Sequence, residues 1–411
     1  HQYSVGVGSP RFPVLIDLMK IAAIKPLICH AYRTNWVFVK VLTDDGLHGV
    51  GEATLEYREL TVAQAVRELE RTLVGQDARN IEAIWHRAYR DVYWRGGPVL
   101  MSALSAVEMA LWDIKGKELG VPVYQLLGGK VRDEVPCYAN GWFAPARTPA
   151  EFAEKARQAV AAGFRGLKWD PFGSAYLDID KRALRGALQC IEAVVNAVGP
   201  EVDILIEGHG RFNVPTAVRI AHALEDYDIH WFEEPVPPDN LEALAEVRQR
   251  SRVPIAAGER IYSRWDYQRF FALRCADFVQ PDVSHVGGIM EVKKIAAQAE
   301  ANHLAICPHN PSGPVANAAT LQLAACVPNF TVLETMSADI PQRGLISTER
   351  LVFRDGKLGI PDAPGLGIDL NEEAIAAHPY EPRELRHYNG KLTDIRPEGA
   401  TDYFQRSTPS K

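Results

Sequence analysis

The sequence predicts an α/β fold in which a barrel of parallel strands follows a smaller α+β unit. Between residues 203 and 334, short apolar runs repeatedly end at a polar or ionisable residue. These end residues recur every 23 to 27 positions, and they are Glu207, Glu233, Glu259, Asp282, His309 and Glu334. One buried strand, one helix and two short loops need about that length of chain.

The segments between these runs have the spacing of amphipathic helices. Apolar residues at 217, 220, 221 and 224 follow the i, i+3, i+4, i+7 pattern, and so do those at 292, 295, 296 and 299. Repeated strand and helix units favour parallel strands, and six consecutive units favour a closed barrel over an open sheet. The carboxyl ends of barrel strands meet at one mouth, so the end residues are expected to share a pocket.

The α+β unit is expected over residues 1–130. Alternating apolar residues at 36–42 and 47–52 flank Thr43-Asp-Asp-Gly46, which is a strong hairpin signal. Helical stretches follow at about 62–74, 81–89 and 98–119, the last ending at Gly120. This unit precedes the barrel in the chain.

The barrel is expected over residues 131–360, with its first strand at 135–138. Thr148 and Glu151 form a capping-box pattern at the start of the next helix, and Gly163 suits its end. The following strand, 164–170, brings Lys168 and Asp170 to its carboxyl end, and counting onward gives eight strands by Glu334. Residues 361–411 are expected to return to the first unit and to end loosely ordered.

Composition narrows the class of protein. The chain has 411 residues, 47% of them hydrophobic and 24% charged, with a net charge of -7. The acidic balance speaks against nucleic-acid binding. The apolar stretch 14–28 contains Asp17, Lys20 and Lys25, which argues against a membrane span. Six scattered cysteines lack metal or disulfide spacing, so a reducing cytoplasm is expected. P-loop, dinucleotide, zinc and nucleophile-elbow motifs are absent from the sequence.

The predicted pocket suggests metal-assisted acid–base chemistry. Three glutamates in one pocket repel each other unless a cation binds or some of them are protonated, and oxygen ligands favour Mg²⁺. Such an ion can hold a substrate carboxylate and stabilise the enediolate formed when the α-proton leaves. His309 is the candidate base, oriented by Asp282, and His209 is the candidate acid toward a leaving hydroxyl. Together these groups would eliminate water.

Several motifs resemble the mandelate racemase group of the enolase superfamily, and most closely its galactonate dehydratase-like acid-sugar dehydratases. The motifs are Glu207-x-His209, Phe232-Glu-Glu-Pro235, Ala257-Gly-Glu-Arg260, Gln280-Pro-Asp282, Pro308-His309, Thr43-Asp-Asp-Gly46, Trp94-Arg-Gly-Gly-Pro98 and Ala110-Leu-Trp-Asp-Ile-Lys-Gly116. The similarity spans nearly the whole chain. A Lys or His base working with Mg²⁺ is an established pairing in this superfamily.

This resemblance implies a modified TIM barrel, (β/α)₇β, with an N-terminal capping domain that closes over the substrate. It implies that Glu207, Glu233 and Glu259 bind Mg²⁺ and that His309 and Asp282 form the base dyad. His209 would expel the 3-hydroxyl, and Glu334 would lie near the substrate carboxylate or the enediolate. The product would be a 2-keto-3-deoxy sugar acid, and the protein would be a homo-oligomer.

Two departures from the family pattern affect the choice of substrate and reaction. The first metal ligand in galactonate dehydratase-like sequences is usually Asp, whereas this chain has Glu207. Racemases of the group carry Lys-x-Lys on the second strand, whereas this chain has Lys168-Trp-Asp170. A racemase, an epimerase and a sugar-lactone cycloisomerase are the enzymatic alternatives. A non-catalytic protein of the same fold is the third.

For some residues a structural role competes with the functional one. Trp94 and Arg95, in the capping unit, are candidate substrate contacts, as is Asp170, but packing and surface pairing are the alternatives for the first two. Lys168 is either an electrostatic catalyst or part of a salt bridge. Arg211 and Arg260 are expected to support the neighbouring carboxylates.

Overall fold

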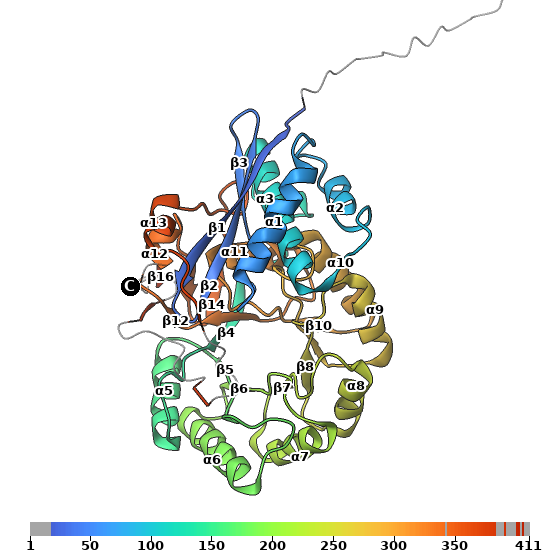
Figure 1. The fold of residues 1–411 in the computed structure, drawn as a ribbon. Coiled ribbons are helices and arrows are strands. Elements are labelled where there is room, and N and C mark those ends of the chain that lie inside the picture. The colour runs from blue at the N-terminus through green and yellow to red at the C-terminus, as the bar shows by residue number, and fades with distance from the viewer. Residues whose placement is uncertain (1–17, 342, 384–389, 392–399, 403–404, 407–411) are drawn as a thin grey trace, which may run out of the picture.

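The amino-terminal part of the chain forms a three-stranded antiparallel sheet with helices packed against it (Figure 1). The computed structural model describes residues 18–341, 343–383, 390–391, 400–402 and 405–406. Strands β1 (Ile21–Ala31), β2 (Thr34–Thr43) and β3 (His48–Glu52) lie in that order, with β2 and β3 forming the expected hairpin. Sequence periodicity did not reveal β1, because its buried and exposed positions do not alternate regularly.

Helices α1 (Glu59–Leu73), α2 (Ile81–Tyr89) and α3 (Gly97–Leu119) follow in this capping unit, close to the expected bounds, and the short helix α4 (Val123–Leu126) comes after them. Helix α3 packs against β3 so closely that a Cβ on Gly51 would lie 1.8 Å from the carbonyl oxygen of Ala106. α3 is long and apolar enough to cross a membrane, but 78% of its apolar window is buried inside the protein. Its apolar character therefore reflects a core position.

Residues 134–336, all of which the structure describes, form eight parallel strands that alternate with seven α-helices. The strands pair in chain order from β4 to β10, and β11 closes the barrel by pairing with β4. A parallel bridge between Ile306 and Phe330 joins the other edge. The elements are β4 (Glu134–Asn140), α5 (Pro149–Ala161), β5 (Gly166–Trp169), α6 (Lys181–Val198), β6 (Asp203–Glu207), α7 (Val214–Leu224), β7 (Trp231–Glu233), α8 (Leu241–Arg250), β8 (Ile255–Ala257), α9 (Arg264–Leu273), β9 (Phe278–Val279), α10 (Ile289–Ala301), β10 (Ala305–Ile306), α11 (Pro314–Cys326) and β11 (Leu333–Met336).

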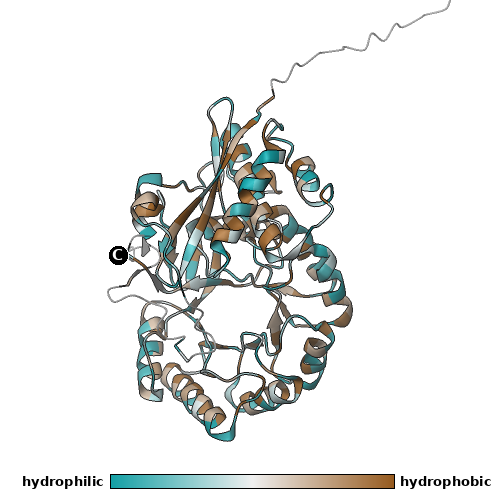
Figure 2. Ribbon diagram, viewed as in Figure 1, coloured by the Kyte–Doolittle hydropathy of each residue, from teal (hydrophilic) through white to brown (hydrophobic). Residues whose placement is uncertain are grey.

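The predicted fold class, a (β/α)₇β barrel with a capping domain, is confirmed. The outer barrel helices have a hydrophobic and a hydrophilic side, as Figure 2 shows, whereas α11 is buried along its whole length. The capping box at the start of α5 is also present, with the Thr148 side chain accepting a bond from the Glu151 backbone N–H. Local capping and helical period therefore agree with the tertiary arrangement.

After the barrel, the chain runs back over β4 and then reaches the capping unit. Strands β13 (Val352–Arg354) and β14 (Lys357–Gly359) form a hairpin, and β14 pairs antiparallel with the first half of β4. Helix α13 (Glu372–Ala377) packs against β1, and Glu372 pairs with Lys40 at 2.6 Å. The expectation of a loosely ordered end concerns residues that lie mostly outside the described ranges.

Cap and barrel are joined by buried polar contacts from α3 and β3. Glu108 of α3 accepts hydrogen bonds from the first backbone N–H groups of α10, at 2.7 Å from Ile289 and 2.9 Å from Met290. Glu52 of β3 does the same for α11, at 2.6 Å from Gly313 and 2.9 Å from Ala316. Each carboxylate satisfies N–H groups that a helix start otherwise leaves unpaired.

Candidate active site

Three carboxylates converge at the carboxyl ends of adjacent barrel strands. Glu207 ends β6, Glu233 ends β7, and Glu259 follows β8 by two residues. Each offers an oxygen, and these three oxygens lie within 4.8 Å of one another. Parallel pairing places Glu207 directly beside Glu233, because register aligns the two strand ends.

Lys168, at the end region of β5, lies among these acids. Its Nζ is 2.6 Å from Glu233 Oε1, 2.9 Å from Glu334 Oε1 and 3.6 Å from Glu207 Oε2. Burial alone would lower the pKa of the ammonium group, but the surrounding carboxylates raise it well above its usual value. Lys168 is therefore a fixed positive charge rather than a proton acceptor at neutral pH.

The glutamate pKa values reflect crowding of negative charge in a buried place. Burial, with repulsion from neighbouring carboxylates, raises the pKa of Glu207 to about 7, of Glu233 to about 8 and of Glu259 to about 7. Such a set of oxygen donors fits a hard divalent cation, whose charge would offset the repulsion among the three carboxylates. The three residues therefore satisfy the donor chemistry of a Mg²⁺ site.

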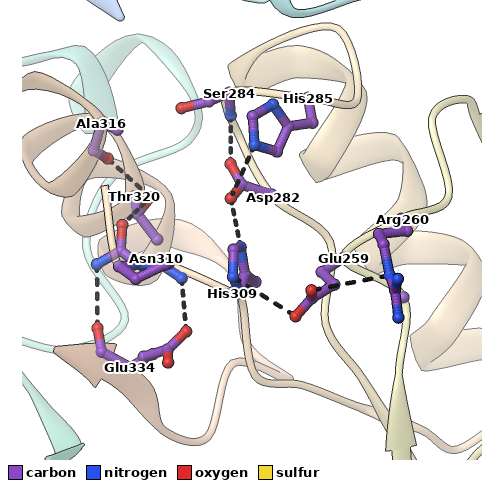
Figure 3. Close-up of polar contacts among 12 residues, drawn as sticks. Glu259, Arg260, Asp282, Ser284, His285, His309, Asn310, Ala316, Thr320 and Glu334 are labelled. Carbon is purple, nitrogen blue, oxygen red and sulfur yellow. Dashed lines mark hydrogen bonds and ion pairs between the residues drawn. The ribbon is translucent and has the colours of Figure 1, made fainter. Parts of the chain in front are cut away.

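Figure 3 shows the second cluster, a histidine held by an aspartate one strand away. His309, after β10, places Nδ1 at 2.7 Å from Asp282 Oδ2, and Asp282 follows β9. Nε2 of His309 lies 3.5 Å from Glu259. Burial opposes protonation, but the charge of Glu259 and the bond to Asp282 together raise the pKa of His309 to about 10.

A second histidine–aspartate pair lies on another side of the pocket. His209 Nδ1 is 2.6 Å from Asp170 Oδ2, and Arg211 donates to both Asp170 oxygens at 2.7 Å. His209 has φ of 50°, in the left-handed region that non-glycine residues rarely adopt. The tight turn after Glu207 and the Asp170–Arg211 pair therefore fix where this imidazole lies.

A cavity of about 380 Å³ joins the two histidines. Its lining combines barrel residues with the loop after β3 and the turn between β1 and β2. Arg33, in that turn, forms an ion pair with Glu56 and donates to the Pro311 carbonyl at 3.3 Å. The capping unit therefore covers the mouth of the barrel, and its polar side chains face the same space as the catalytic candidates.

Two sequence-based expectations differ from this geometry. Trp94 and Arg95 do not line the cavity; they line a separate hollow on the capping unit, and Trp94 is 82% exposed. Asp170 is buried behind His209, with its carboxylate bonded to Arg211, so it positions the histidine instead of lining the cavity. Local sequence gives no sign of these orientations, because loop conformation and an arginine 41 residues away decide them.

Other expected residues lie where the sequence placed them, in or directly beneath the cavity. Lys168, Glu207, His209, Glu259, His309 and Glu334 line it, and Glu233 and Asp282 are buried in contact with them. Arg211 is buried and holds the Gly208 and Gly173 carbonyls, while Arg260 pairs with Glu234. Sequence reasoning missed the lining residues Arg33, Asn140, Tyr262 and His285.

The capped barrel and its acidic strand ends define an enolase-type barrel enzyme. Residues 19–128 match the mandelate racemase/muconate lactonizing enzyme N-terminal domain family, and residues 151–374 match the enolase C-terminal domain-like family. The chain belongs to the enolase superfamily, in its mandelate racemase subgroup.

Curated relatives with 38% and 39% sequence identity cover most of the chain. The D-gluconate dehydratase of Thermoproteus tenax is 39% identical over 89% of this chain and 75% of its own length. The D-galactonate dehydratase of Pectobacterium atrosepticum is 38% identical over 83% of this chain and 90% of its own. A solved enolase superfamily member from Salmonella Typhimurium superposes with a TM-score of 0.85 at 32% identity, covering 88% of this chain and 99% of that one.

Proposed function

We propose that this protein is a Mg²⁺-dependent dehydratase of an acid sugar, converting it to a 2-keto-3-deoxy acid. The observation that carries the proposal is the pair of aspartate-held histidines, His309 and His209, that line one cavity with Glu207 and Glu259, while Glu233 is buried in contact with the lining residues. One histidine can take a proton while the other gives one, which is what elimination of water requires. The dehydratase names of the relatives point to the same reaction class.

Glu207, Glu233 and Glu259 would hold the Mg²⁺. When bound, the ion would neutralise negative charge that develops on the substrate carboxylate as the C2 proton leaves. Lys168 and Glu334 form a buried ion pair beside these ligands, at 2.9 Å. The pair holds the positive charge of Lys168 and the carboxylate of Glu334 in place at the wall of the cavity, where the substrate would bind.

His309 takes the C2 proton in this mechanism, and Asp282 holds its other nitrogen so that Nε2 faces the site. The pKa of about 10 would leave His309 protonated at pH 7 in the ion-free protein. Glu259 supplies the largest of the raising contributions, so neutralising its charge would lower the pKa of His309 and favour its role as a proton acceptor. Ligand occupancy and base strength are therefore coupled.

His209 then protonates the 3-hydroxyl as the C3–O bond breaks, and water leaves. The electron pair of the C2–H bond becomes the C2=C3 double bond, and the resulting enol tautomerises to the ketone. A two-base racemase needs a proton acceptor opposite His309. Lys168 is held protonated by three carboxylates, and Asp170 is bonded to Arg211, so neither serves that purpose.

Proton NMR in D₂O, with Mg²⁺ and a panel of aldonates, aldarates and lactones, tests the proposal. A 2-keto-3-deoxy product is expected from at least one acid, and His309→Asn should abolish both dehydration and α-deuterium exchange. Exchange or lactone rearrangement without a keto acid would favour a racemase or cycloisomerase. If the His309→Asn variant dehydrates the acid at the full rate, His309 is not the base.

A further inference from the structure

His285 is a cavity-lining residue that the mechanism above does not use. It lies in the loop between β9 and α10, next to Asp282 (Figure 3), and is 9% exposed. Its ring reaches the capping unit on one side and the cavity on the other. A buried imidazole facing a space for a polyhydroxylated acid has to present either a hydrogen-bond donor or an acceptor there.

The contact with Ser102 of α3 decides which. Ser102 Oγ lies 2.6 Å from the Pro98 carbonyl oxygen, which can only accept, so the single hydroxyl hydrogen is used there. The same Oγ lies 2.9 Å from His285 Nδ1 and must therefore accept a hydrogen from it. This assigns the Nδ1–H form to His285, so in the neutral ring Nε2 carries a lone pair.

Nε2 has no hydrogen bond to any residue in the described part of the chain. Its nearest carboxylate, Asp282 Oδ2, is 3.7 Å away, too far for a hydrogen bond, and that oxygen already binds His309 Nδ1 at 2.7 Å. Burial and the neighbouring His309 lower the pKa of His285, outweighing the charges of Asp282 and Glu56. The ring is therefore neutral, and Nε2 is an unpaired acceptor.

We propose that His285 binds the substrate by accepting a hydrogen bond from one of its hydroxyl groups through Nε2. This inference rests on the proposed acid-sugar substrate. A lone pair beside the Asp282 carboxylate attracts a hydroxyl donor and repels a second carboxylate, so this wall of the cavity selects hydroxylated carbon. Because α3 fixes the tautomer, the capping unit contributes to specificity through Ser102, which does not line the cavity.

The test couples the residue to one hydroxyl group. D-gluconate, D-galactonate and their analogues with fluorine replacing the hydroxyl at C4, C5 or C6 are assayed with the Mg²⁺-loaded protein. Fluorine keeps the size but cannot donate. At one carbon the replacement should raise KM roughly tenfold in the wild type, as expected for a lost buried hydrogen bond, and less than twofold in His285→Phe. His285→Gln, which retains an acceptor, should restore part of the discrimination.

A purely structural role for His285, supporting Asp282, predicts a different result. His285→Phe would then lower kcat equally for every analogue, with the penalty for fluorine unchanged, and this outcome overturns the proposal. Ser102→Ala, which leaves the cavity lining intact, should weaken the same hydroxyl preference and keeps the proposal testable if His285→Phe does not fold. The same comparison can be made by binding in the Mg²⁺-loaded His309→Asn background, which does not turn the acids over. There the affinities of the panel, with His285 present and with it replaced by Phe, measure the coupling between His285 and one hydroxyl group. A wild type that shows no dehydration, while this binding still shows the coupling, would refute the proposed function and leave the His285 contact standing.

Discussion

Asp170→Asn should lower both the stability and the activity of this protein, by two separable routes. The carboxylate of Asp170 is buried between Arg211, bonded to both of its oxygens at 2.7 Å, and His209 at 2.6 Å. Asparagine keeps the size but removes the charge. Arg211, whose side chain is fully buried, then keeps a positive charge with no counter-ion at this contact.

The cost of leaving one partner of a buried pair uncompensated is about 3–5 kcal/mol, and the free energy of unfolding should fall by that amount in urea titrations. The loss should depend on pH. Burial raises the pKa of Asp170, but Arg211 and His209 lower it more, so its charge contributes stability above the unfolded pKa of about 3.9. That contribution is lost as pH falls through the lower folded value, so the gap between wild type and variant should narrow in acid.

The same substitution leaves His209 without its charged anchor. Dehydration should slow about 10²-fold or more in kcat, the scale of one general acid, with KM little changed because Asp170 does not line the cavity. Asp178→Asn is the matched control, since Asp178 is 70% exposed and pairs with a half-exposed arginine, so its loss should matter far less. An Asp170→Asn protein with wild-type stability and kcat would refute the assigned role.

Further predictions concern the carboxylate cluster and the contact of α3 with β3. Mg²⁺ binding at pH 7 should release protons, because Glu207, Glu233 and Glu259 have raised pKa values of about 7 to 8 and must ionise to bind the ion. Titration calorimetry in two buffers of different ionisation enthalpy measures this, and identical heats would contradict it. Gly51→Ala should destabilise the fold by about 1–3 kcal/mol or more, because its Cβ would meet the Ala106 carbonyl. Gly186→Ala, in α6 with open space around it, should instead stabilise by about 0.4–1 kcal/mol, and denaturant titrations of both variants check the two signs.

The parts of the structure that follow from local sequence were predicted well. Short apolar runs that stop at a polar or ionisable residue marked the barrel strands without coordinates: Glu207 and Glu233 end β6 and β7, and Glu334 lies within β11. The same rule would have found Asn140, which ends β4 and donates to Glu334 at 2.8 Å. Helix ends could be predicted from capping residues, because a cap also depends on residues that are close together in the sequence.

Features that depend on how distant segments meet could not be read from the sequence. Arg33 reaches the cavity only because the β1–β2 turn comes to the loop after β10, where it binds Pro311. The acceptor character of His285 depends on Ser102, 183 positions earlier in the chain. Strand β1 escaped detection because its buried and exposed positions do not alternate regularly. Long-range contacts, rather than local propensity, decide each of these.

The buried contacts of α3 also bear on how this protein comes apart. Ser102, Ser105 and Glu108 bond in turn to His285, Gly287 and the start of α10, so one face of a capping helix holds a single barrel loop. The capping unit cannot separate from the barrel at this contact without breaking the hydrogen bonds that the barrel loop makes to α3. Amide exchange of α3 and of residues 285–290 should therefore share one opening free energy, which would make the helix and the barrel loop one cooperative unit of unfolding across the boundary between the two sequence families.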